Sequence, residues 1–293
     1  MTLRLKNLMN SLNKRQIYLH LLNDTALKRF SFILITFFVL SITKSTAQYT
    51  TGVTGLLHMP SAEMQEDGTF MIGGNFMNKK NLPNKYRWYY NSYNYYMNIT
   101  FLNRIEISYI CTLVKGIPNT KYWPKQTWDK FVNQDRHFAA RLQVLKEKEL
   151  WKYMPSIVLG VNDPTTGTGG GDYTKMNVKG TGNGYFNRWY VAMTKHFDTP
   201  YGELGVHAAY LYNRRTDYHL NGPAVGVNFR PTIHPELNII AEYDAKTINV
   251  GAIYSLWHDH FNITLEMQEG KYFSGGFVYK VNLLGGNRWS SWK

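Results

Sequence analysis

The chain has 293 residues, of which 15% are aromatic and 18% charged, and its mean hydropathy is −0.37. That mean is too polar for a bundle of transmembrane helices, but a membrane barrel can have it because its apolar side chains alternate with polar ones. The net charge of +13 comes from scattered basic residues, which excludes the basic stripe of a nucleic-acid-binding protein, and the single cysteine, Cys111, excludes an intramolecular disulfide.

The sequence of residues 1–47 indicates an N-terminal extension and a signal peptide. A basic pair at 28–29 precedes the apolar run Phe30–Ile42, and the small residues Ser45 and Ala47 follow. This order is typical of a secretory signal, and the run is short for a membrane span. We expect cleavage near Ala47, with an uncleaved anchor as the alternative. Without this segment, which holds seven basic residues and one acidic residue, the net charge falls to +7.

Residues 48–293 predict one transmembrane β-barrel domain. Apolar and polar residues alternate along a series of segments, most clearly in Leu237–Val281. A period of two indicates strands with one apolar face, and short joints between them indicate antiparallel neighbours. The predicted strands are Gly68–Met77, Tyr90–Phe101, Arg104–Leu113, Arg136–Lys146, Ser156–Val161, Phe186–Phe197, Gly202–Tyr212, Ala224–Arg230 and four within Leu237–Val281.

The apolar faces of these strands need a cover, which either a second sheet or lipid could supply. Aromatic residues such as Tyr254 and Phe273 lie near strand ends, as in the girdle of an outer-membrane barrel. Connections alternate between short, as at Pro231–Pro235, and long, as at Lys115–Gln134. We therefore predict an all-β fold, a single antiparallel outer-membrane β-barrel of about 12 strands with long loops on one rim. Tyr49–Asp67 is not a clean strand and could narrow the lumen.

Charged residues on the polar faces are the candidates for a functional site. Glu242 and Asp244 lie two apart on one strand, so both point the same way, and Glu266 could join them from a nearby strand. Paired acids can serve glycoside hydrolysis, but acids in a lumen more often pair with inward Arg or Lys, and a bound cation or glycan is a third option. The expected lumen-facing charged residues are Glu106, Arg141, Arg230, Glu242, Asp244, Glu266 and Lys280.

For Glu242 and Asp244 we expect basic partners such as Arg230 or Lys280, with a cation or an arginine between the two carboxylates. The glycine-rich run 167–172 is expected to be a surface loop, because no helical pattern follows it that could complete a phosphate site. We predict no catalytic residue, no metal and no cofactor.

Three groups of short motifs follow one another along the chain. They are Gly55–Ala62 with Asp67-Gly68; Gly160–Asp163, Gly167–Gly169, Tyr185–Phe197 and Tyr201–Gly205; and Ala241–Asp244 with Asn249–Gly251. In this order they resemble the YjbH family of outer-membrane proteins linked to exopolysaccharide production, and the Glu-Tyr-Asp motif is the most specific. The resemblance implies a role in polymer export or in the envelope of a Gram-negative bacterium, without implying a reaction.

We therefore expect a non-enzymatic outer-membrane barrel that acts as a pore or an accessory for export or surface assembly of exopolysaccharide or capsule. One alternative is a structural subunit of a larger outer-membrane complex, with a filled lumen. Another is a barrel enzyme acting on lipid or glycan. The expected partners are outer-membrane lipid, polysaccharide and other envelope proteins, and not nucleic acid.

Overall fold

A computed structural model describes residues 52–82, 88–118, 123–164, 185–213 and 220–284. The predicted signal peptide with its cleavage near Ala47 and the glycine-rich run 167–172 lie outside these residues. Within the described ranges, no helix is long and apolar enough to cross a membrane.

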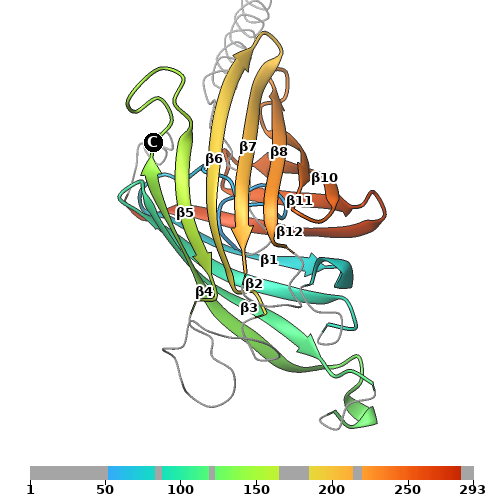
Figure 1. Cartoon of the computed structure of the whole chain (residues 1–293). Helices are drawn as coiled ribbons and strands as arrows, with labels where there is room; N and C mark the ends of the chain where they lie inside the picture. The colour runs from blue at the N-terminus through green and yellow to red at the C-terminus, as the bar shows by residue number, and fades with distance from the viewer. Residues whose placement is uncertain (1–51, 83–87, 119–122, 165–184, 214–219, 285–293) are drawn as a thin grey trace, which may run out of the picture. The chain divides into compact units, whose positions relative to one another are not determined.

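Twelve strands in the described part of the chain form a closed antiparallel barrel (Figure 1). Each strand pairs with its neighbours in sequence, and β1 pairs with β12 to close the ring. The prediction of a single all-β barrel of twelve strands is confirmed. The strands are β1 (Thr69–Met77), β2 (Ser92–Phe101), β3 (Ile105–Lys115), β4 (Phe131–Leu145), β5 (Ser156–Asn162), β6 (Arg188–Thr199), β7 (Gly202–Tyr212), β8 (Gly222–Pro231), β9 (Leu237–Tyr243), β10 (Ile248–Leu256), β11 (Phe261–Gln268) and β12 (Tyr272–Asn282).

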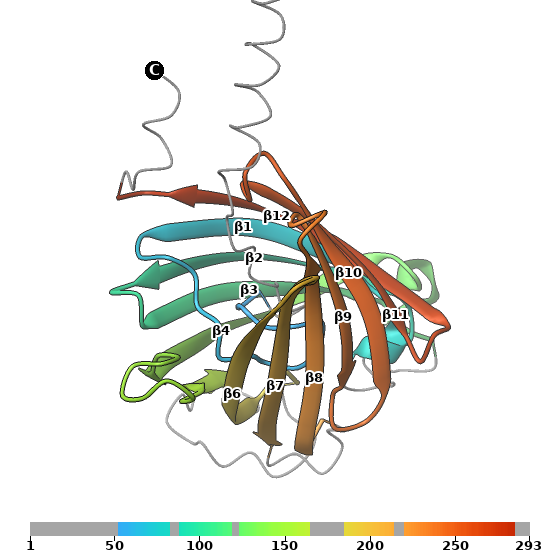
Figure 2. The ribbon, with the colours of Figure 1, turned by 90° about the horizontal axis from the view of Figure 1, so that it is seen from above.

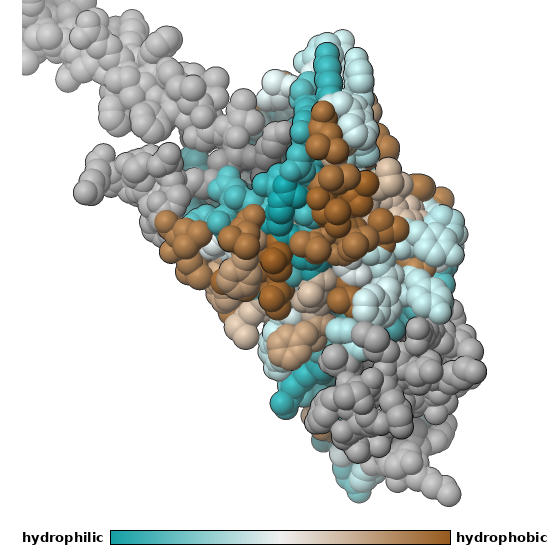
Figure 3. All heavy atoms as spheres, turned by 60° about the vertical axis from the view of Figure 1, so that its left-hand side comes forward, coloured by the Kyte–Doolittle hydropathy of each residue, from teal (hydrophilic) through white to brown (hydrophobic). Residues whose placement is uncertain are grey.

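The outward side chains of the barrel are mainly apolar, and most of the inward ones are polar. On β11, Ile263 and Leu265 face outward with 37% and 55% of their surface exposed, whereas Asn262 and Glu266 face inward and are buried. Apolar side chains cover much of the exterior face in Figure 3, where they are brown. This arrangement is the reverse of a water-soluble barrel and is typical of a barrel that lies in lipid.

The connections divide the barrel into two rims. The loop rim carries the long connections 78–91, 116–130, 163–187 and 213–221, together with the turns 244–247 and 269–271. Two short 3-10 helices, η1 (Lys79–Asn81) and η2 (Lys125–Thr127), lie in the first two of these connections. The turn rim carries 102–104, 146–155, 200–201, 232–236 and 257–260, as well as the start of β1 and the end of β12.

Strand β4 begins five residues earlier than the predicted Arg136. Its outward face carries Gln134 and Arg136 near the loop rim, before Phe138 and Leu142 continue the apolar face. The apolar-polar alternation therefore stops before the strand does, and a sequence pattern cannot mark the true start. A register shift between Val114 and Lys115 of β3 accompanies this extension.

Residues 52–67, here called the plug, precede β1 and lie inside the barrel (Figure 2). Within the plug, a tight hairpin joins Gly55 to Pro60. Its fully buried Leu56 and Leu57 belong to an apolar cluster with inward residues of β5 to β10. Glycines make room for them, because a Cβ at Gly226 would lie 2.5 Å from Leu56 and one at Gly251 would lie 3.0 Å from Leu57.

Candidate functional site

The tip of the plug is bound by the carboxylate of Glu242, which points inward from β9. Glu242 accepts hydrogen bonds from the backbone N–H groups of Leu57 at 3.0 Å, His58 at 2.6 Å and Met59 at 3.2 Å. The side-chain amide of Asn249 donates a further bond at 3.1 Å. Successive N–H groups at a chain reversal form a concave anion site, and here the anion is a side chain of the barrel wall.

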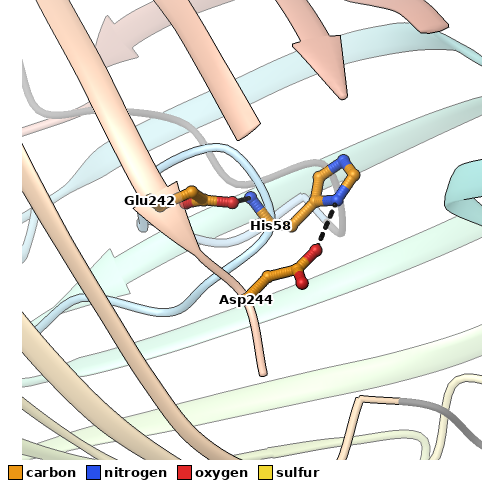
Figure 4. Close-up of side chains that lie close together, drawn as sticks. All are labelled: His58, Glu242 and Asp244. Atoms are coloured by element: carbon orange, nitrogen blue, oxygen red, sulfur yellow. Dashed lines mark hydrogen bonds and ion pairs between the residues drawn. The ribbon is translucent and has the colours of Figure 1, made fainter. Parts of the chain in front are cut away.

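The imidazole of His58 lies between two further carboxylates. Its Nδ1 is 3.2 Å from Asp244 and its Nε2 is 2.8 Å from Glu266, and all three side chains are buried. Figure 4 shows the ring beside Asp244 while the His58 backbone meets Glu242. We call His58, Glu242, Asp244 and Glu266 the latch.

The latch favours the charged form of His58. Burial by itself lowers the pKa of His58, but the charge of Glu266 and hydrogen bonds to Asp244 and Glu266 outweigh burial and raise that pKa well above its ordinary value. Burial likewise raises the pKa of Asp244, yet the hydrogen bond and charge of His58 and the Thr247 amide hold it below its ordinary value. Both shifts favour an ion pair between His58 and Asp244.

A second anchor, made by Arg141 and Glu106, holds both limbs of the hairpin. The Arg141 guanidinium donates to the carbonyl oxygens of Thr54, Ser61 and Glu63, and it lies 3.3 Å from Glu106. Glu106 in turn accepts from the Thr54 N–H at 2.7 Å. Arg141 and Glu106 are both fully buried, so this ion pair depends on the plug for its remaining hydrogen bonds.

A third anchor holds the side chain of Glu63, near the turn rim. Glu63 lies 3.1 Å from Arg230 and 3.2 Å from His196, and Arg230 also pairs with Glu203 at 2.7 Å. Burial raises the pKa of Glu63, but the hydrogen bond from His196 and the charge of Arg230 hold it well below its ordinary value. The plug is thus bound by charged groups from both ends of the barrel.

The seven charged residues predicted to face the lumen are all buried, and six of them contact the plug or form its anchors. The seventh, Lys280, pairs with Asp259 at 3.2 Å. The expected pairing of Glu242 and Asp244 with Arg230 or Lys280 is not seen. Arg230 and Lys280 lie near the turn-rim ends of their strands, whereas the two acids lie at the loop-rim end of β9.

Sequence reasoning missed His58 and Glu63. A signal for His58 was present, because Glu242, Asp244 and Glu266 gather at one end of β9 to β11 without an inward Lys or Arg near them in the strand pattern. Such an excess of buried negative charge requires a cation from another segment. His58 is the one ionisable residue in Gly55–Ala62, which the alternation left unassigned.

Ligand atoms of His58, Glu242 and Asp244 all lie within 4.8 Å of one another, close enough to hold a metal ion. Each of these side chains already has protein partners, and three of the partners are plug amides. An ion would have to compete with the plug for the same oxygens. The geometry therefore fits the binding of a protein segment.

Comparison with known proteins gives one family match. The family model YjbH, described as exopolysaccharide biosynthesis protein YbjH, matches residues 47–218. No curated protein sequence matches the chain. Among solved structures, the chain is similar to the outer membrane phospholipase A from Escherichia coli, with 9% identity, a TM-score of 0.30, and coverage of 74% of this chain and 96% of that one. An overlap at that score supports no argument about this site.

Proposed function

Because the chain belongs to the YjbH family of exopolysaccharide biosynthesis proteins, we propose that it is an outer-membrane barrel that serves this process as a non-enzymatic accessory. The apolar exterior supports the membrane location, because a closed barrel satisfies its backbone hydrogen bonds within lipid. By analogy with outer-membrane barrels, the turn rim would face the periplasm and the loop rim the outside.

The observation that carries this proposal is the plug in the lumen. Leu56, Leu57 and Met59 have no exposed surface, and charged wall residues bind the backbone around them. A polymer could use this lumen only after the plug had moved. The protein is therefore closed at rest, and it acts either as a gated passage or as a filled subunit of an export complex.

The state of the carboxylates supports a non-enzymatic role over the lipid or glycan enzyme. Glu242 is held by three plug amides, and Asp244 and Glu266 share His58. Acid-base chemistry on a substrate requires carboxyl groups that can reach it. These groups are buried beneath the plug and already engaged.

The proposal is tested by conductance and by a polysaccharide assay. Purified full-length protein in a planar bilayer should show little conductance, whereas an Arg141→Met/Glu242→Gln variant should open more often. In cells that lack the gene, surface polysaccharide should fall and should be restored by the wild-type chain.

Three results would contradict the proposal. A large, permanently open channel in the wild type would contradict the closed lumen. Unchanged polysaccharide in the deletion strain would contradict the role in biosynthesis. Hydrolysis or transfer by the purified protein on lipid or glycan, lost in the Glu242→Gln variant, would favour the enzyme.

A further inference from the structure

The wall side of the latch is made of carboxyl groups that lie next to one another. Glu242 and Asp244 both accept a hydrogen bond from the side-chain amide of Asn249, at 3.1 and 2.9 Å. Asp244 and Glu266 contact the two nitrogen atoms of one imidazole ring, that of His58. The three carboxyl groups are therefore neighbours, and the plug tip fills the space between them; Figure 4 shows two of them beside the tip.

Further oxygen atoms lie beside these carboxyl groups. The Thr247 hydroxyl is 3.4 Å from each carboxylate oxygen of Asp244, and it accepts from the Gln268 Nε2 at 3.3 Å. The other end of that amide, Gln268 Oε1, is buried and has no hydrogen-bond partner among the described residues. A buried acceptor of this kind indicates a place for a water molecule or an ion. Gln268 Oε1 is therefore a spare ligand atom at the edge of the latch.

The positive charge that pairs with this wall belongs to the plug. His58 forms the ion pairs with Asp244 and Glu266, whereas Arg188 of β6 meets the tip elsewhere, 3.4 Å from the His58 carbonyl oxygen. Release of the tip removes the imidazole from the wall and frees the Glu242 oxygens from the plug amides. Neighbouring carboxylates repel one another, so a replacement cation would stabilise the released state.

We propose that the wall of the released latch binds a divalent cation, Ca²⁺, through Glu242, Asp244 and Glu266, and that calcium thereby favours release of the plug. This inference rests on the proposed closed lumen and adds a ligand that regulates it. With the side-chain oxygens of Asn249 and Gln268, the donor set is all oxygen, which suits a hard cation. Ca²⁺ accepts about 6–8 oxygen ligands in an adaptable arrangement, whereas Mg²⁺ requires a strict octahedron and retains its water.

The cation and the plug tip exclude one another. The imidazole of His58 occupies the space between Asp244 and Glu266, and its positive charge repels an ion there. A ligand that binds only the released state raises the ratio of released to seated plug by one plus the ratio of its concentration to its Kd. With a Kd of about 1 mM, as in extracellular calcium sites, about 10 mM calcium should raise that ratio about 11-fold.

The test measures release of the plug in the full-length protein held in neutral detergent. Position 61 is fully buried, so a thiol placed there by Ser61→Cys, with Cys111→Ser, reacts with maleimide when the plug has left its seat. The labelling rate follows the released fraction if reseating is fast. About 10 mM CaCl2 should speed labelling about 11-fold, and MgCl2 should have a smaller effect. NaCl of equal ionic strength measures the effect of screening alone.

Two variants and a control locate the ion. Asp244→Asn/Glu266→Gln should label faster than the wild type without calcium, because His58 loses its partners, and should not respond to calcium. The matched control Asp129→Asn/Glu269→Gln alters two exposed acids of the loop rim and should respond as the wild type does.

The second variant, His58→Gln, keeps the wall intact. Equilibrium dialysis with radioactive calcium should show tighter apparent binding to this variant than to the wild type, because the tip competes less for the wall. This readout does not depend on assembly of the double variant.

Equal labelling rates with and without calcium would overturn the inference, as would an equal response to NaCl or in the Asp244→Asn/Glu266→Gln variant. Slower labelling in calcium, or weaker calcium binding by His58→Gln, would overturn it in favour of an ion held by His58, Glu242 and Asp244 while the plug is seated. If the wild type is labelled as fast as a free thiol without calcium, the closed lumen itself is refuted, whatever calcium does.

Discussion

Replacing Glu242 with glutamine exchanges one of its two acceptor oxygens for an amide NH2 and keeps the size of the side chain. One carboxylate oxygen accepts from the amides of Leu57 and Met59, and the other accepts from His58 and the Asn249 side chain. In either orientation of the glutamine, two of these donors therefore face an NH2 group that cannot accept a hydrogen bond. A buried donor left without its acceptor costs about 1–3 kcal/mol, so the loss of two acceptors should weaken seating of the plug by about 3 kcal/mol. At 1.4 kcal/mol per factor of ten, the ratio of released to seated plug should rise at least 100-fold.

The assay follows a cysteine placed in the plug. Ser61 is fully buried, and Ser61→Cys in a Cys111→Ser background leaves that thiol as the sole cysteine of the chain. If reseating is fast, the rate of maleimide labelling of the folded barrel tracks the fraction of released plug. We expect Glu242→Gln to speed labelling about 100-fold at neutral pH.

The control is Asp259→Asn, which alters another buried lumen carboxylate. Asp259 pairs with Lys280 and accepts from Asn262, away from the plug tip. The Asp259→Asn substitution should leave the labelling rate within a few-fold of that of the wild type. A wild-type rate in the Glu242→Gln protein would refute the view that this carboxylate holds the plug, and an equal rise in the control would show general loosening of the barrel instead.

Three further predictions address the exterior, the imidazolium and the second anchor. Leu265→Arg should destabilise the inserted barrel by about 2–4 kcal/mol if the site lies near the bilayer midplane, and should therefore lower the heat-modifiable fraction on gels. The control Leu265→Ala should assemble, and normal assembly of the arginine variant would argue against lipid at this face. The raised pKa of His58 means that its stabilising charge is present below pH 6.5 and is lost as the pH rises through the raised pKa. Plug labelling, normalised to a free thiol, should therefore accelerate at alkaline pH, and His58→Gln should reduce this acceleration. Arg141→Met leaves Glu106 buried without its cation and should lower the free energy of unfolding by about 3–5 kcal/mol. The double variant Arg141→Met/Glu106→Gln should recover part of this loss. Equal stability of the single and double variants in denaturant melts would contradict the ion pair.

The barrel could be predicted because its strands carry a local signal. Within Leu237–Val281, each outward residue is apolar and each turn is short, so hydropathy alone gives the faces and the pairing. The start of β4 could not be found in this way, since Gln134 and Arg136 are polar although they face outward. Alternating hydropathy reveals a strand only where its outward face lies in an apolar medium, so the pattern ends where the outward side chains become polar.

The plug contacts could not be derived from local pattern. Gly55–Ala62 has no period, and its partners lie far along the chain, with 185 residues separating Leu57 from Glu242. Those contacts join backbone amides to a side chain, so any sequence at the tip that allows the turn could make them. The alternation predicted that the charged wall residues face inward. It could not identify their partners, because those partners lie in the plug, and the plug has no alternating pattern.

The plug is also covalently tied to the wall that it closes. It continues directly into β1 through Gly68, whose N–H binds the Thr100 carbonyl and whose carbonyl accepts from Leu283. A tip that leaves the latch therefore stays within a short tether of its seat, at an effective concentration on the order of millimolar. A soluble competitor for Glu242, Asp244 and Glu266 must therefore be present at more than this effective concentration if it binds the wall as tightly as the tip does. A competitor that binds more tightly needs a proportionally lower concentration. Release of the plug is for this reason a brief excursion, unless a partner captures the freed segment or occupies the vacated wall.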